Sequence, residues 1–110
     1  MKLLTKELRD SLPHFMATED KQPEEIPIIV TFFHPLSNWT WYATEGEPIL
    51  NEEGEEIDFH FFGLVRGFEN ELGYFSLNEM KGVKGPCGLG IERDLYFGKH
   101  TLAEAMEQRI

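Results

Sequence analysis

Apolar and polar residues alternate with a period of two along several segments of the chain, which predicts β-strands. Residues 28–33 form a continuous β-branched and aromatic run, typical of a strand that is buried on both faces. Alternating runs follow at 39–44 and 58–66. A fourth run at 72–77 comes so soon after the third that the two are expected to pair antiparallel. Residues 91–97 alternate as an edge strand.

Three helix-capping signals lie between and around these runs. Thr5 opens a predicted helix that extends to about Ser11 and ends before Pro13. Ser76–Glu79 and Thr101–Glu104 have the spacing of capping boxes, in which a hydroxyl and a glutamate satisfy free backbone amides. Helices at both ends with antiparallel strands between them predict an α+β fold. We expect the whole chain to form one small domain with an antiparallel sheet of about four to five strands and short N-terminal and C-terminal helices.

Negative charge is concentrated in the middle of the chain. Residues 22–65 contain nine carboxylates and no lysine or arginine, and they supply most of the net charge of −10. Residues 45–57 hold six glutamates, two glycines and a proline, which predicts a long exposed hairpin loop. Such a field repels phosphate backbones and attracts basic surfaces, so no direct contact with nucleic acid is expected. The simpler interpretation is a loop that only keeps the protein in solution.

Cysteine usage and hydropathy predict a cytoplasmic protein. Cys87 is the only cysteine, so no disulfide can form within the chain, as is typical of a reducing compartment. No apolar run reaches the roughly 18 residues that a membrane helix needs. Lys2 and Lys6 interrupt the first apolar residues, so we expect neither a membrane span nor a signal peptide.

Motifs for metal or cofactor binding do not appear. The four histidines, at positions 14, 34, 60 and 100, have no second His or Cys at metal-binding spacing. Residues 82–90 are rich in glycine but match no phosphate-binding motif, and Pro86 removes a backbone donor that such a loop would use. We therefore expect no bound metal and no cofactor.

Two charged clusters are the candidates for catalysis. One lies at the entrance of the fourth predicted strand and the other alternates along the last strand; their members are Glu69, Glu71, Glu92, Arg93 and Asp94. Paired carboxylates can exchange protons or bind a divalent cation when the fold brings them together. The alternative is that these side chains cap turns and form ion pairs with nearby arginines.

The densest aromatic cluster lies at residues 38–42. Trp39 and Trp41 share one face of the predicted strand, and Tyr42 lies on the other. A place in the core is the default for tryptophan, whereas an exposed pair would stack against a ring or an arginine of a partner.

Five strings of residues occur in a fixed order: Leu4-Thr5-Lys6-Glu7-Leu8, Ala17-Thr18-Glu19-Asp20, Ser37-Asn38-Trp39-Thr40-Trp41-Tyr42-Ala43-Thr44-Glu45, Glu69-Asn70-Glu71-Leu72-Gly73-Tyr74-Phe75-Ser76-Leu77 and Gly88-Leu89-Gly90-Ile91-Glu92-Arg93-Asp94-Leu95. In these strings the chain resembles a bacterial family, domain of unknown function 2958, over almost its whole length. The resemblance implies an accessory protein of plasmids, phages or integrative elements, and it supplies no catalytic residue. The acidic loop is longer than the family pattern, and Leu89-Gly90 stands where the family pattern has Leu-Pro.

These observations favour a protein-binding module over an enzyme. We expect a partner with a basic surface, such as a nuclease or DNA-processing complex of a host defence system, in which carboxylates would take the place of phosphates. The binding residues expected are Trp39, Trp41, Tyr42, Glu45, Glu47, Glu52, Glu53, Glu55, Glu56 and Asp58. A small carboxylate-dependent enzyme, with or without a divalent metal, is the first alternative, and a structural or assembly subunit is the second.

Overall fold

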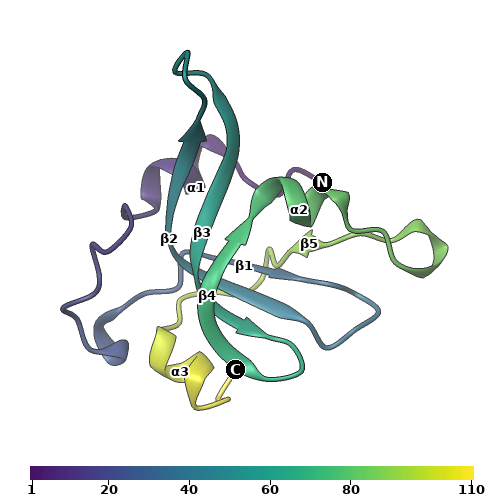
Figure 1. Cartoon of the computed structure of the whole chain (residues 1–110). Coiled ribbons are helices and arrows are strands. Elements are labelled where there is room, and N and C mark those ends of the chain that lie inside the picture. Colours follow the sequence, from purple (N-terminus) through teal and green to yellow (C-terminus); the bar gives the residue numbers. More distant parts are fainter.

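The chain folds around a five-stranded antiparallel sheet with short helices at its periphery (Figure 1). The computed structural model describes residues 1–110, except for the side chain of Pro86. The strand order is β4-β3-β2-β1-β5. The strands are β1 (Val30–Phe33), β2 (Thr40–Leu50), β3 (Glu56–Arg66), β4 (Asn70–Ser76) and β5 (Glu92–Arg93). The predicted α+β class and the antiparallel pairing of the last two long strands are confirmed.

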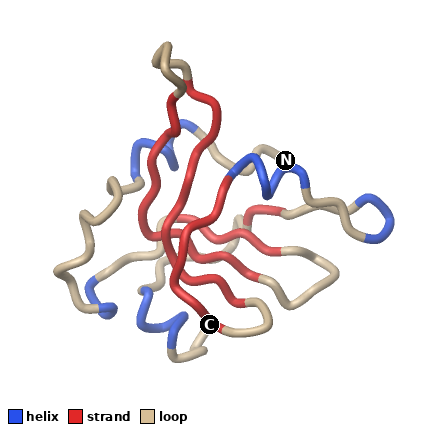
Figure 2. Tube along the Cα trace, in the orientation of Figure 1, coloured by secondary structure: helices blue, strands red, loops and turns tan.

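Three short helices, drawn in blue in Figure 2, begin where the capping signals predicted. The hydroxyls of Thr5, Ser76 and Thr101 each accept a hydrogen bond from the backbone N–H three residues later. Each cap satisfies one of the free amides that a helix leaves at its start. The helices are α1 (Lys6–Ser11), α2 (Leu77–Gly82) and α3 (Leu102–Met106), with 3₁₀ turns at Pro23–Glu25 and Pro86–Gly88.

The sheet buries apolar side chains on both of its faces. What we call the phenylalanine face carries Phe32, Phe59 and Phe61, which pack with leucines from the N-terminal segment and with α2. The opposite face, the tyrosine face, carries Tyr42 and Leu64 and is covered by Ile26, Ile28, Leu102 and Ala105. The alternation predicted for residues 58–66 is confirmed, since odd positions of β3 enter the first cluster and Leu64 the second.

The acidic segment is less of a loop than the sequence predicted. β2 continues to Leu50 and β3 begins at Glu56, so the turn spans only residues 51–55. The register shifts between Ala43 and Glu45, which marks a bulge where β2 accommodates an extra residue. The two strands then project beyond the rest of the sheet as a long hairpin (Figure 1).

The last predicted strand is shorter than expected. Only Glu92 and Arg93 pair with β1, although the backbone N–H of Asp94 still donates to the Thr31 carbonyl at 2.9 Å. The Asp94 carboxylate then accepts a hydrogen bond from the Tyr96 N–H at 3.0 Å. This side-chain turn ends the strand, because it bends the backbone away from β1.

Within the described part of the chain, no helix combines the length and the apolar character that crossing a membrane requires.

Candidate binding surfaces

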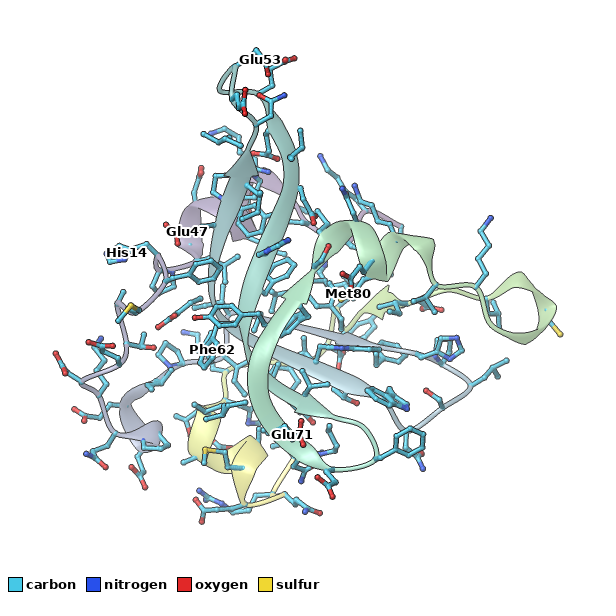
Figure 3. The ribbon with its side chains drawn as sticks, in the orientation of Figure 1. His14, Glu47, Glu53, Phe62, Glu71 and Met80 are labelled. Atoms are coloured by element: carbon cyan, nitrogen blue, oxygen red, sulfur yellow. The ribbon has the colours of Figure 1, made fainter. Side chains whose placement is uncertain are left out.

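The acidic residues of the hairpin divide into an exposed tip and a base that belongs to the fold. Glu52, Glu53 and Glu55 are exposed at the turn, and Figure 3 shows Glu53 at its apex. The Asn51 side chain accepts hydrogen bonds from the backbone N–H groups of Glu53 and Glu55, at 3.0 and 2.9 Å, and so fixes the turn. These three carboxylates are the part of the predicted acidic surface that is exposed at the turn, and the Glu55 carboxylate also accepts a long hydrogen bond of 3.4 Å from the Asn51 amide.

Glu45 is a buried structural residue. Only 3% of its surface is exposed. One carboxylate oxygen accepts a hydrogen bond from the Met16 N–H at 2.9 Å, and the other accepts from the Thr18 N–H at 3.0 Å and from the Thr18 hydroxyl. The prediction that Glu45 belongs to an exposed acidic surface is therefore wrong, because three donors of the 14–20 segment converge on it.

Glu47 and Glu56 also have partners within the fold. Glu47 accepts one long hydrogen bond, at 3.3 Å, from the backbone N–H of Phe15. Both oxygens of Glu56 accept from the Arg9 guanidinium, with Nη1 at 2.7 Å from Oε2. The hydrogen bond from Arg9 lowers the pKa of Glu56, and the positive partner cancels the charge that this residue would have presented.

Asp58 joins β3 to the start of α2. Its carboxylate accepts hydrogen bonds from the Ser76 hydroxyl at 2.6 Å and from the backbone N–H groups of Asn78 and Phe59 at 3.0 and 2.7 Å. His60 Nε2 lies 3.0 Å from the same carboxylate. Burial by itself would raise the pKa of Asp58, but these hydrogen bonds outweigh it and hold the pKa below its usual value. Asp58 therefore stabilises the fold at the base of the hairpin.

The aromatic residues do not lie beside the acidic tip. Trp39 and Trp41 are half-buried and stack with ring centroids 5.9 Å apart, while Trp39 also meets Phe68 at 5.4 Å. Tyr42 is buried on the opposite face, so it does not meet the condition of exposure under which it was expected to anchor a partner. Leu50 follows Trp41 by nine positions along β2, or about 30 Å along a strand. The predicted acidic and aromatic surface is therefore not one continuous face.

The two charged clusters considered for catalysis lie on opposite edges of the sheet. Glu69 and Glu71 belong to the β4 edge, whereas Glu92 and Asp94 belong to the β5 edge. Four strand spacings of about 4.8 Å separate these edges by about 19 Å. Arg93 turns to the phenylalanine face, where it donates to the Lys2 carbonyl at 2.8 Å. The structure does not bring these side chains into one pocket, because the chain order of the strands is not their order in the sheet.

The open edge of the sheet is β4. Its seven residues pair with β3 on one side, and its other side has no strand neighbour in the described part of the chain. Leu72 and Tyr74 both point to the tyrosine face, where they stand opposite Leu64 and Phe62 of β3, and they remain 48% and 64% exposed. An unpaired edge with exposed apolar side chains is a template for pairing with another chain.

An apolar groove of about 400 Å³ runs beside this edge on the tyrosine face. The 14–20 segment, held by Glu45, forms one wall, and α3 forms another. Figure 3 shows His14, Glu47 and Phe62 on the left of the view. It shows Glu71 at the bottom, far from Glu53 at the tip of the hairpin. The residues that line the groove are Met16, Thr18, Glu19, Lys21, Pro23, Ile26, Thr44, Glu45, Phe62, Leu72, Tyr74, Leu102 and Met106.

The sequence of β4 contains the pattern of an exposed apolar strand face, although the prediction for this string concerned only its carboxylates. Leu72 and Tyr74 lie two residues apart and share one face of the strand, whereas Glu71 and Phe75 share the other. That spacing predicts a strand with apolar residues on one face and a mixed set on the other. Whether such a strand lies at the edge or in the middle of a sheet depends on pairing that a single sequence does not show.

Together the fold and these surfaces define a small α+β protein with a sheet covered on both faces, one open edge and an apolar groove beside that edge. The chain belongs to the protein family of unknown function DUF2958, whose sequence profile matches residues 3–108. The family resemblance is thereby confirmed, while the association with mobile elements stays a prediction. Searches among curated proteins and among solved structures find no match. Among the described residues, no three His, Cys, Asp or Glu side chains are grouped to suit a metal ion.

Proposed function

We propose that this protein is a protein-binding module that takes an extended, basic and apolar segment of its partner onto the edge of β4. The observation that carries the proposal is the combination of an unpaired seven-residue strand with exposed Leu72 and Tyr74 beside the apolar groove. In this mode of recognition, backbone hydrogen bonds along the edge provide affinity, and pockets for alternate side chains provide specificity.

β4 carries one charged residue, Glu71, but lacks the other features that usually protect an edge strand. It contains no proline and no lysine, and its pairing with β3 runs without a bulge from Asn70 to Ser76. The opposite edge is protected by its length, since β5 has only two residues. The asymmetry between the edges favours β4 as the place where another chain adds a strand.

The side chains around β4 specify the chemistry of the partner. A strand added to β4 places every second residue on the tyrosine face, against Leu72 and Tyr74. The alternate residues lie on the phenylalanine face, which carries Glu71 at one end of β4 and Phe75, packed on the core, near the other. Apolar residues suit the first set, and a lysine or arginine suits the position beside Glu71. A second copy of this chain fits less well, because two copies that each carry a net charge of −10 repel each other.

The exposed hairpin tip assists such a partner from a distance. β4 ends at Ser76, which pairs with His60, and β3 begins four residues earlier at Glu56, so the tip lies about 13 Å or more beyond β4. At that distance Glu52, Glu53 and Glu55 attract a basic segment at low salt rather than pair with it. In its most specific form, the proposal is that this protein is an accessory protein of a mobile element and binds a defence complex that targets nucleic acids. The negative charge and the family resemblance support this more specific proposal.

Two labelled peptides test the proposal directly. One alternates valine with lysine over about nine residues, enough to span an average strand, and the other alternates valine with glutamate. Fluorescence anisotropy should show binding of the lysine peptide alone, weakened at about 0.5 M salt because screening shortens the reach of the charges. Leu72→Ser should weaken binding by about tenfold, and Leu36→Ser, at a site with a similar exposed fraction of 54%, should leave it within about twofold.

Three outcomes would contradict the proposal. The first is equal binding of both peptides, and the second is an equal effect of the two leucine substitutions. The third is a concentration-dependent dimer in sedimentation experiments that Leu72→Ser abolishes, which would assign the edge to a second copy of the chain.

A further inference from the structure

A second concave site lies on the tyrosine face, on the β1 side of the sheet and away from the apolar groove. It is a pocket of about 740 Å³, within the range of cavities that hold small molecules. Side chains of β1, β2 and β3 form its floor, and the segments after β1 and β5 form its walls. The lining residues used below are Thr31, Phe33, Tyr42, Arg66, Asp94, Phe97 and His100.

Two buried polar atoms in this pocket have no hydrogen-bond partner among the described residues. The first is the hydroxyl of Thr31, whose residue is only 3% exposed, and the second is Nε of Arg66. Buried polar atoms without a partner are rare in folded proteins, because each loses its bonds to water and gains nothing in return. Both residues line the pocket, so a polar molecule that enters it is the partner we infer for these atoms.

Other groups in the pocket are only partly engaged. The Tyr42 oxygen accepts a hydrogen bond from Arg66 Nη1 at 2.9 Å, so its own proton is free to be donated. Burial raises the pKa of Tyr42 against the opposing effect of Arg66, and the phenol therefore keeps that proton at neutral pH. His100 Nδ1 forms a hydrogen bond with the Glu104 carboxylate at 2.8 Å, which leaves Nε2 available to a ligand. Asp94 uses one carboxylate oxygen for its turn, and the other is an available acceptor. The pocket thus offers both donors and acceptors.

Charge and shape restrict the ligand further. Arg66 and Asp94 contribute one positive and one negative charge to the lining, so an uncharged ligand suits the pocket best. The net charge of −10 disfavours phosphates in particular. Phe33 and Phe97 add aromatic surface, on which a flat ring stacks favourably.

We propose that this pocket binds a nucleobase, free or as its uncharged nucleoside. Such a ring stacks on aromatic side chains, and its rim both donates and accepts hydrogen bonds, which complements Thr31, Tyr42 and Asp94. The proposal is independent of the β4 edge, because the two sites share no lining residue.

Titrations followed by ¹H–¹⁵N NMR test this site with uracil, uridine, adenine, adenosine, the two nucleoside monophosphates and glucose. We expect saturable shifts at residues of the pocket with the bases or nucleosides, and binding weaker by about tenfold for the monophosphates. Thr31→Val keeps the shape of the side chain and removes the partnerless hydroxyl, so it should weaken binding by about tenfold without lowering the melting temperature.

Thr44→Val is the matched control. Thr44 is equally buried, but its hydroxyl donates to the Phe62 carbonyl at 3.2 Å, and it lines the apolar groove. This variant should melt earlier and bind the nucleoside as the unmodified protein does. Unchanged binding by Thr31→Val, or the absence of saturable shifts up to about 10 mM of every base and nucleoside, would overturn the proposal and leave water as the occupant. Saturable binding of glucose alone would overturn the assignment to a nucleobase.

Discussion

Replacement of Glu45 tests whether a buried carboxylate builds one wall of the apolar groove. Three hydrogen bonds converge on it from Met16 and Thr18, and Thr18 itself is buried. Met16 also has a positive φ of 69°, which is unfavourable for a residue with a side chain and is held in place by the Glu45 bond to its N–H. Glu45→Ala removes the acceptor and leaves the donors inside the protein.

The cost follows from the number and burial of these donors. A hydrogen bond to a charged group contributes about 1.5–3 kcal/mol, and a buried donor without a partner costs about 1–3 kcal/mol. Met16 is exposed, so water can replace the acceptor for its N–H, whereas the two donors of Thr18 cannot be rescued so readily. We expect Glu45→Ala to lower the free energy of unfolding by about 3–5 kcal/mol, a large part of the roughly 5–15 kcal/mol typical of a domain.

Urea unfolding at pH 7, followed by tryptophan fluorescence, measures this change. Glu45→Gln retains one acceptor and should lose about 2 kcal/mol. Glu47→Gln keeps an oxygen that can accept the single long bond from Phe15 and should lose less than about 1 kcal/mol. Hydrogen exchange should be faster across residues 14–20 in Glu45→Ala, and the alternating lysine peptide should bind it more weakly. A loss below about 1 kcal/mol, or unchanged exchange in that segment, would refute the structural role assigned to Glu45.

Two further predictions concern the sheet. A Cβ at Gly63 would lie 1.8 Å from the Tyr42 carbonyl oxygen, whereas one at Gly73, the residue paired with Gly63, would meet nothing within 4 Å. Gly63→Ala should therefore cost more than about 4 kcal/mol or prevent folding, and Gly73→Ala should stay within about 0.5 kcal/mol, as thermal unfolding of both variants would show. Because the folded-state pKa of Asp58 is lowered, its contribution is complete above the unfolded value of about 4 and is lost as the pH falls below it. Asp58→Asn should be less stable at pH 7 and should flatten the decline of stability between about pH 5 and pH 2, and an unchanged acid profile would contradict this assignment.

The sequence by itself determined the features that depend on neighbours within a few residues. Thr5, Ser76 and Thr101 begin helices, because a hydroxyl reaches the amide three residues later wherever the rest of the chain lies. The alternation in residues 58–66 fixed which side chains enter each core, because successive residues of a strand face opposite sides. The sequence did not predict where the last strand ends. The alternation of apolar and polar residues continues past Asp94, but the turn made by the Asp94 side chain ends the pairing there.

Only the tertiary structure decided which distant residues meet. The order β4-β3-β2-β1-β5 places Glu71 and Asp94 on opposite edges, although both belong to charged strings that look alike in sequence. The same pairing brings Thr31, Arg66 and Asp94 into one pocket, and it buries Glu45 under a segment almost thirty residues earlier in the chain. The physical reason is that strand pairing and the burial of a carboxylate are settled by backbone hydrogen bonds and donors far away in sequence, which no local pattern of apolar and polar residues records.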